Sequence, residues 1–190
     1  MNLQAILLSD NVVDSINENL DYLLQIIPEI SNMIKFEHKH PHHIVGTIWD
    51  HVLLTLKISD NNNEFKRETD SKKLFYIRLA LLLHDIGKCD SEYDIPDATG
   101  VRHYKGHPEK SEKIARGILQ RLGYNEDDIN YICYLIKYHD TPITDISISN
   151  NYEMCEVLYE VQRCDALAHH PDKLEKRKVY LNKIKDKLSK

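Results

Sequence analysis

The run LLLHDIGK at residues 81–88 places a histidine and an aspartate side by side at the end of an apolar helical pattern. A carboxylate is rarely buried in a protein core unless it is paired or binds a metal. Taken alone, the run also suits an ordinary helix end, where His84 interacts favourably with the helix dipole and Gly87 caps the helix in the left-handed conformation. Further ligands elsewhere in the chain decide between these two interpretations.

Length and composition predict one globular domain built from long regular elements. The chain has 190 residues with only 6 Gly and 6 Pro, which argues against a loop-rich scaffold. Charged residues make up 29% and the formal net charge is −5, so a nucleic-acid partner is disfavoured. No apolar run reaches the ~20 residues needed to span a bilayer, so no membrane partner is expected.

The cysteines and the N-terminus predict a cytoplasmic protein. The four cysteines form no C-x-x-C pair, which favours a reducing compartment. Residues 3–8 are apolar but lack a basic flank and a small-residue cleavage site, so no signal peptide is predicted.

Hydrophobic periodicity predicts an all-α fold. Two or three helices are expected within residues 3–35, the last of them beginning at Pro28. Between 89 and 106 the helical period fails and turn residues accumulate, so at most a small hairpin is expected there. The other helices are expected at about 43–59, 72–86, 108–122, 126–139 behind an Asn125 cap, 151–169 and 173–189, with Pro171 between the last two.

Four of these helices interrupt an inward apolar stripe with a side chain that can bind metal. The four residues are His51, His84, His139 and Asp165, and His107 joins them from a loop just before a helix. A single buried histidine is usually an ordinary core residue, but a lone buried carboxylate is costly to desolvate. Their convergence in one helical core therefore predicts a metal site. Imidazole and carboxylate ligands suit Fe, Mn, Co, Ni or Zn better than Ca.

The ordered ligand set and its flanking sequence resemble the HD-domain phosphohydrolase superfamily, and especially the HD domain of bacterial CCA-adding tRNA nucleotidyltransferases. The similar segments are NMIKFEHKHPHHIVGTIWDHVL at 32–53, RLALLLHDIGK at 78–88, HYKGHPEKSEKIA at 103–115, YHD at 138–140 and VQRCDALAHHP at 161–171. The resemblance implies one HD-domain helical bundle over 1–190, with a helical extension at 1–35, a core at 36–172 and a C-terminal helix at 173–190. Neither the glycine–serine turn nor the D-x-D pair of the nucleotidyltransferase head is found, so a standalone HD domain without nucleotide addition is expected.

The resemblance also implies the metal ligands. His51, His84, Asp85 and Asp165 would hold one ion, and His107 and His139 would hold a second that shares Asp85. Two ions about 3.5–4 Å apart can activate water and hold phosphoryl oxygens. A single ion is the alternative, and Mg is admitted as an alternative metal. The predicted set leaves out His43, His169 and His170, and His43 is the first of these to reconsider as a ligand.

The implied activity is metal-dependent hydrolysis of phosphomonoester or phosphodiester bonds in small nucleotides, with 2′,3′-cyclic phosphates one candidate class. Asp85 and Lys88 are the expected catalytic residues, and Arg102, Lys105 and Lys110 are expected to form the substrate lip. Hydrolysis of dinucleoside polyphosphates is an alternative. A catalytically silent regulatory module that keeps its metal is an alternative of another class. The sequence leaves the metal, the physiological substrate and the oligomeric state open.

Overall fold

The structure, a computed structural model, describes residues 2–37, 46–60, 70–93, 96–99 and 101–189. Within these ranges the fold is all-α, as predicted, without a strand, and an isolated bridge joins Glu37 and Thr47. The α-helices are α1 (Leu3–Leu7), α2 (Val12–Glu18), α3 (Leu20–Ile26), α4 (Ile30–Lys35), α5 (Ile48–Asp60), α7 (Ser71–Leu83), α8 (His107–Arg121), α9 (Glu126–Tyr138), α10 (Asp145–Asn150), α11 (Tyr152–Leu167) and α12 (Pro171–Leu188). Two short 3₁₀ helices, η1 (Ile86–Cys89) and η2 (Ser91–Tyr93), follow α7.

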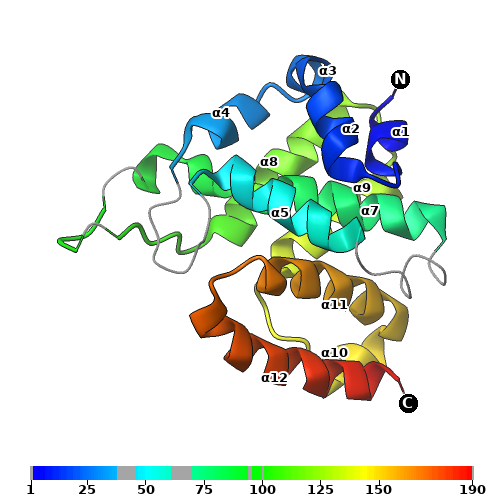
Figure 1. The fold of residues 1–190 in the computed structure, drawn as a ribbon. Coiled ribbons are helices and arrows are strands. Elements are labelled where there is room, and N and C mark those ends of the chain that lie inside the picture. The colour runs from blue at the N-terminus through cyan, green and yellow to red at the C-terminus, as the bar shows by residue number, and fades with distance from the viewer. Residues whose placement is uncertain (1, 38–45, 61–69, 94–95, 100, 190) are drawn as a thin grey trace.

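Helix α7 is the centre of the bundle. Every residue from Phe75 to Leu83 is buried, so the helix is covered on all sides. It packs against α5, α9 and α11, and α1 also contacts it. In Figure 1 the helices α1 to α4 lie on one side of α5 and α7, while α11 and α12 lie together on the other side. The sequence that leads to His84 and Asp85 is therefore the most enclosed segment of the molecule.

Arg78 is a fully buried charge within this central helix. Its Nη1 atom donates hydrogen bonds to the carbonyl oxygens of Leu7 at 2.7 Å and Ser9 at 2.8 Å. Its Nη2 atom pairs with Asp60 Oδ1 at 2.6 Å, and Nε donates to Ser59 Oγ at 3.2 Å. One guanidinium thus joins the end of α1, the end of α5 and the middle of α7.

Several helix boundaries differ from those predicted. Residues 3–35 form four helices, and the last begins at Ile30, two residues after Pro28. Helix α7 ends at Leu83, so the histidine and aspartate lie in the turn beyond it, and no strand forms in the described part of 89–106. An additional short helix, α10, begins at a Thr144 capping box, and Pro171 begins α12 instead of separating two helices. The Asn125 cap is present, with its side chain accepting from the Asp128 N–H.

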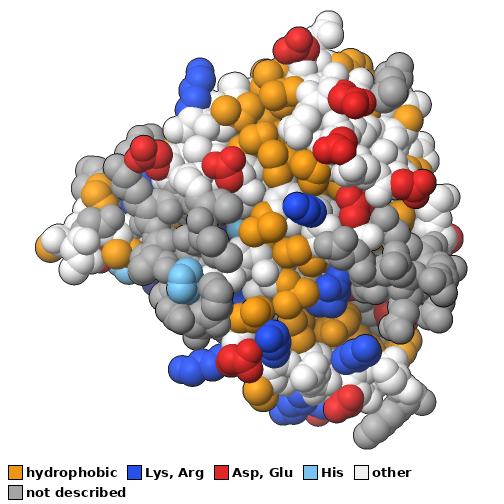
Figure 2. All heavy atoms as spheres, viewed as in Figure 1, with side chains coloured by type: hydrophobic (Ala, Val, Ile, Leu, Met, Phe, Trp, Pro, Cys, Tyr) orange, Lys and Arg blue, Asp and Glu red, His pale blue; other side chains and the backbone are white. Residues whose placement is uncertain are grey.

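The surface combines an apolar band with local charge. Figure 2 shows hydrophobic side chains running down this face, with Lys and Arg side chains gathered toward its lower part. That region corresponds to α12 in Figure 1, whose sequence carries seven Lys or Arg residues and three Asp or Glu residues. Among the described helices, none combines the length and the hydropathy that a membrane span requires.

We expect Arg78→Met to destabilise the fold by about 3–5 kcal/mol, since removal of the guanidinium leaves its polar partners at the ends of α1 and α5 unsatisfied. Arg116→Met is the control, because Arg116 makes a partly exposed pair with Glu112 at 3.0 Å that contributes at most about 1 kcal/mol. Urea unfolding followed by circular dichroism measures both free energies of unfolding. Equal losses in the two variants would contradict the role assigned to Arg78.

Candidate metal centre

Six buried side chains from different parts of the chain converge on one point. Helix α5 supplies one histidine, the turn after α7 supplies the adjacent histidine and aspartate, and the start of α8, the end of α9 and the last part of α11 supply the others. They are the six residues His51, His84, Asp85, His107, His139 and Asp165. His107 is the first residue of α8 and not, as expected, part of the preceding loop.

The carboxylate of Asp85 lies between two groups of imidazoles. Its Oδ2 atom is 3.5 Å from Nε2 of His51 and 3.4 Å from Nε2 of His84. Its Oδ1 atom is 3.3 Å from Nε2 of His107 and 3.8 Å from Nε2 of His139. Together with Asp85, His51 and His84 form one group of three candidate ligands, and His107 and His139 form another. Within each group the candidate ligand atoms lie within 4.8 Å of one another. The geometry therefore suits two neighbouring ions that share Asp85.

Asp165 extends the first of these groups. Its Oδ1 atom lies 3.0 Å from Nε2 of His51 and 3.6 Å from Nε2 of His84. The position follows from the helical period, since Asp165 continues the buried stripe of Leu158 and Val161 on α11. Four protein ligands are thus available for one ion and three for the other.

Backbone hydrogen bonds fix three of the imidazole rings. The Nδ1 atoms of His84, His107 and His139 lie 2.8, 2.8 and 2.6 Å from the carbonyl oxygen three residues earlier. A carbonyl oxygen only accepts, so the hydrogen of each neutral ring is on Nδ1 and the lone pair is on Nε2. All three Nε2 lone pairs therefore point into the cluster, as metal ligands require.

The donor atoms of this cluster fit a cation better than they fit one another. The Nε2 atoms of His107 and His139 approach to 3.2 Å, although in these tautomers both present lone pairs. Nε2 of His84 and Oδ1 of Asp85 are buried and make no hydrogen bond with the described residues. A divalent ion between these atoms removes the repulsion and satisfies them. Imidazole and carboxylate donors suit Fe, Mn, Co, Ni or Zn.

Burial and charge set the protonation of the metal-free cluster. Burial lowers the pKa of His51, and burial together with the charge of His84 lowers the pKa of His139 to about 4. Burial alone would raise the pKa of Asp85, but His84 and Lys88 hold it well below its usual range. Burial would lower the pKa of His84, but Asp85 and Asp165 together outweigh it and the pKa is raised. Metal binding at His84 therefore competes with protonation.

Gly87 brings α8 close to the turn that follows α7. Its N–H donates to Ser111 Oγ at 2.9 Å. A Cβ atom at this position would lie 2.5 Å from the backbone nitrogen of Ser111 and 2.7 Å from the carbonyl oxygen of His107. Among the described glycines only Gly106 and Gly123 have a positive φ, so Gly87 is not the left-handed cap that its position after the helix suggested. It is needed for close backbone approach.

The cluster opens into a cavity of about 430 Å³ that holds only part of the expected substrate lip. Lys88 lines it, is buried, and donates to Asp85 Oδ2 at 2.7 Å, while Lys105 lines the same cavity. Arg102 instead donates to the carbonyl oxygen of Glu37 at 2.7 Å. Lys110 pairs with Asp90 at 2.8 Å and lines a separate cavity. The structure therefore brings Lys88 and Lys105, but neither Arg102 nor Lys110, to the metal-site cavity.

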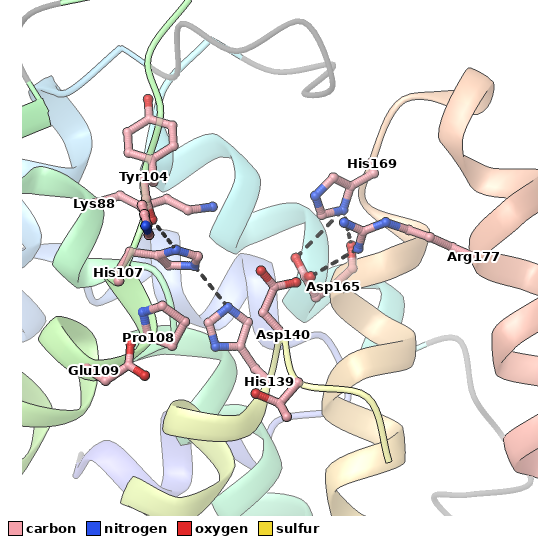
Figure 3. Close-up of a pocket in the computed structure, with 13 residues that line it drawn as sticks. Lys88, Tyr104, His107, Pro108, Glu109, His139, Asp140, Asp165, His169 and Arg177 are labelled. Atoms are coloured by element: carbon pink, nitrogen blue, oxygen red, sulfur yellow. Dashed lines mark hydrogen bonds and ion pairs between the residues drawn. The ribbon is translucent and has the colours of Figure 1, made fainter. Parts of the chain in front are cut away.

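Two residues that the sequence analysis left out line this cavity (Figure 3). Nδ1 of His169 donates to the carbonyl oxygen of Asp165 at 2.7 Å, and its ring centroid lies 5.4 Å from that of His51. Nη1 of Arg177 reaches from α12 to within 3.5 Å of Asp165 Oδ2. His169 lies one helical turn beyond Asp165, which is a usable sequence signal, whereas nothing local points to Arg177. His170 does not line the cavity, and His43 lies outside the described residues.

We expect Gly87→Ala to destabilise the protein by about 1–3 kcal/mol, because the added methyl group must push the start of α8 away. The same shift would displace His107 and lower the affinity for metal. Gly117→Ala, also on α8, meets open space and should stabilise the protein by about 1 kcal/mol through helix propensity. Thermal unfolding with and without metal tests the pair, and unchanged metal affinity in Gly87→Ala would show that this contact does not position His107.

We expect Asp85→Ala to lose all bound metal, since Asp85 is the residue that both ligand groups share. In a two-ion site His107→Ala should lose one of two equivalents and keep the ion held by His51 and Asp165. His103→Ala is the control, because His103 is exposed and pairs with Asp97 away from the cluster. Elemental analysis of the purified variants gives the stoichiometry. If His107→Ala keeps the metal content of the wild-type protein, the site holds a single ion that does not need His107. If Asp85→Ala keeps it, Asp85 is not the centre of the site.

Comparison with known proteins agrees with this arrangement. The family model described as the HD domain matches residues 48–181, more than two thirds of the chain and all six clustered residues. No curated protein matches the sequence. HD domains bind divalent metal ions and are generally metal-dependent phosphohydrolases. The chain belongs to the HD-domain family.

Proposed function

We propose that this protein hydrolyses phosphomonoester or phosphodiester bonds of small nucleotides, with 2′,3′-cyclic phosphates one candidate class. One observation carries the proposal. Asp85 lies between two groups of inward-facing imidazole Nε2 atoms, and three members of this cluster, His107, His139 and Asp165, line a cavity that basic side chains also line. The ligand set is complete, which argues against a silent module that has lost its chemistry.

Residues of this chain would hold the metal and the phosphate on adjoining surfaces. His51, His84, Asp85 and Asp165 would hold one ion, and His107 and His139 with Asp85 a second. When bound, such ions supply Lewis acidity and lower the pKa of a coordinated water toward neutrality. The protein supplies the orientation, because hydrogen bonds from Nδ1 to backbone carbonyls fix the rings of His84, His107 and His139.

Basic side chains provide the charge that a phosphate ester requires. Lys88 is buried beside Asp85, where its ammonium group donates to Oδ2 and stands 5.4 Å from the ring centroid of Tyr104. From that position it can neutralise a phosphate or protonate the departing oxygen. Lys105 and Arg177 also line the cavity, and Arg177 comes from the basic helix α12. Because Glu109, Asp140 and Asp165 line the same cavity, the bound metal would have to supply the further positive charge that attracts an anion.

The cavity favours a small substrate. Its volume of about 430 Å³ lies within the range of roughly 300–1,000 Å³ that is typical of small-molecule sites. A nucleoside phosphate is of suitable size, whereas a dinucleoside polyphosphate would have to extend beyond this cavity. Hydrolysis of dinucleoside polyphosphates therefore remains the second candidate and belongs in the same assay.

We expect metal-loaded protein to release product from at least one substrate class in a panel of nucleoside monophosphates, 2′,3′-cyclic nucleotides and dinucleoside polyphosphates. EDTA should abolish the activity, added metal should restore it, and Asp85→Ala should lack it under both conditions. Chromatography of the products identifies the bond that is cleaved. If no member of the panel is turned over with Fe, Mn, Co, Ni, Zn or Mg, the proposed hydrolase is wrong and the silent module is favoured.

A further inference from the structure

A second cavity of about 230 Å³ adjoins the metal site between α11 and α12. We call it the α11–α12 slot. Pro142, Gln162 and Ala166 line it from the segment after α9 and from α11, and Lys176, Tyr180 and Leu181 line it from α12. None of these six residues belongs to the ligand cluster, so the metal site does not account for the slot.

The slot is continuous with the metal-site cavity. Five residues line both cavities, namely His139, Asp140, Thr141, Asp165 and Arg177. Two of them are metal-ligand candidates, so the slot begins at the ligand cluster itself. Figure 3 shows Arg177 extending from α12 toward Asp165, and Arg177 lines both spaces. A molecule with its phosphate at the metal centre would have its remaining part within reach of the slot.

Hydrogen bonds fix the polar groups that line the slot. Nε2 of Gln162 donates to the carbonyl oxygens of Tyr138 at 3.0 Å and Thr141 at 2.7 Å. The Tyr180 hydroxyl donates to Oε1 of Gln162 at 2.7 Å and accepts the N–H of Ile143 at 2.9 Å. These groups are already bonded within the protein, so the slot offers a ligand mainly apolar and aromatic surface of fixed shape.

The two spaces therefore differ in chemistry. The metal-site cavity carries imidazole, carboxylate and ammonium groups, whereas the residues that line only the slot are a proline, an alanine, a leucine, a tyrosine, a hydrogen-bonded glutamine and one lysine. A matching ligand has an anionic group joined to a flat, weakly polar ring. Among phosphate esters, a nucleotide has this form, and bases stack on aromatic side chains with little dependence on their identity.

We propose that the α11–α12 slot is the subsite for the base of the nucleotide substrate. The identity of the ligand rests on the proposed function, while the slot itself rests on its shape and lining. Tyr180 would provide the aromatic face on which the base stacks. Ala166, on the α11 side, would leave room for the base because its side chain is small. Arg177 lines both cavities and would contact the phosphate. Helix α12 would thus determine which phosphate esters the metal centre receives.

The test measures binding of adenosine, cytidine and ribose to metal-loaded protein in the presence of inorganic phosphate, by isothermal titration calorimetry. None of these probes contains a phosphoester, so the result does not depend on catalysis. The nucleosides should bind at least tenfold more tightly than ribose. Ala166→Leu, which fills the slot, should weaken nucleoside binding at least tenfold and leave the affinity for inorganic phosphate unchanged.

Two further variants keep the test interpretable. Tyr180→Leu removes the ring and should also reduce nucleoside affinity, which guards against a folding defect that is specific to Ala166→Leu. Val179→Leu is the control, because Val179 is 71% exposed on α12 and does not line the slot. Circular dichroism and thermal melting establish that each variant is folded.

The outcomes separate this inference from the proposed function. If nucleosides bind no better than ribose, or if Ala166→Leu leaves their affinity unchanged while phosphoesters are still hydrolysed, the base subsite is wrong and the hydrolase stands. If nucleosides bind in the slot but no phosphoester is turned over, the subsite stands and the hydrolase is wrong. Absence of both nucleoside binding and turnover overturns both.

Discussion

A carboxylate without solvent-exposed surface, that of Asp85, is the constraint on which the rest of this structure depends. Transfer of an ionised carboxylate from water to a protein core costs several kcal/mol unless opposite charge and hydrogen bonds compensate it. Here Lys88 lies 2.7 Å from one oxygen, and four imidazole Nε2 atoms lie within 3.8 Å of the two oxygens, where a metal ion held by them would supply the remaining positive charge. Those groups lie on α5, α7, α8 and α9 or directly beside them. Satisfying one aspartate therefore fixes how these helices meet.

The features that the sequence predicted are those that depend on local periodicity. A side chain that continues an apolar stripe must face the same side of its helix, so His51 and Asp165 could be placed in the core before any contact was known. The Asn125 cap is likewise a local signal. The shared role of Asp85 was expected from the family resemblance and not from periodicity, and its two oxygens face different imidazoles.

The features that the sequence did not predict depend on contacts between distant segments. Arg177 and Lys110 are both basic residues on helices, and nothing in the sequence around them distinguishes their roles. In the structure Arg177 reaches Asp165 in the cluster, whereas Lys110 pairs with Asp90 and Glu92. Arg78 resembles any helix surface charge until the ends of α1 and α5 are placed beside it. For Gly87 the sequence suggested a turn conformation, whereas the actual requirement is space for the backbone of α8. The sequence shows where helices form, but it does not show which helices come into contact or how closely they approach.

The orientation of three helices adds an electrostatic contribution of its own. His84 and His139 are the C-terminal caps of α7 and α9, so both helices direct the negative end of their backbone dipole toward the cluster. His107 begins α8, which directs its positive end there instead. The two negative ends favour a cation at the cluster, and the positive end of α8 favours an anion beside it. The peptide backbone thus contributes charge of both signs to the centre before any side chain is counted.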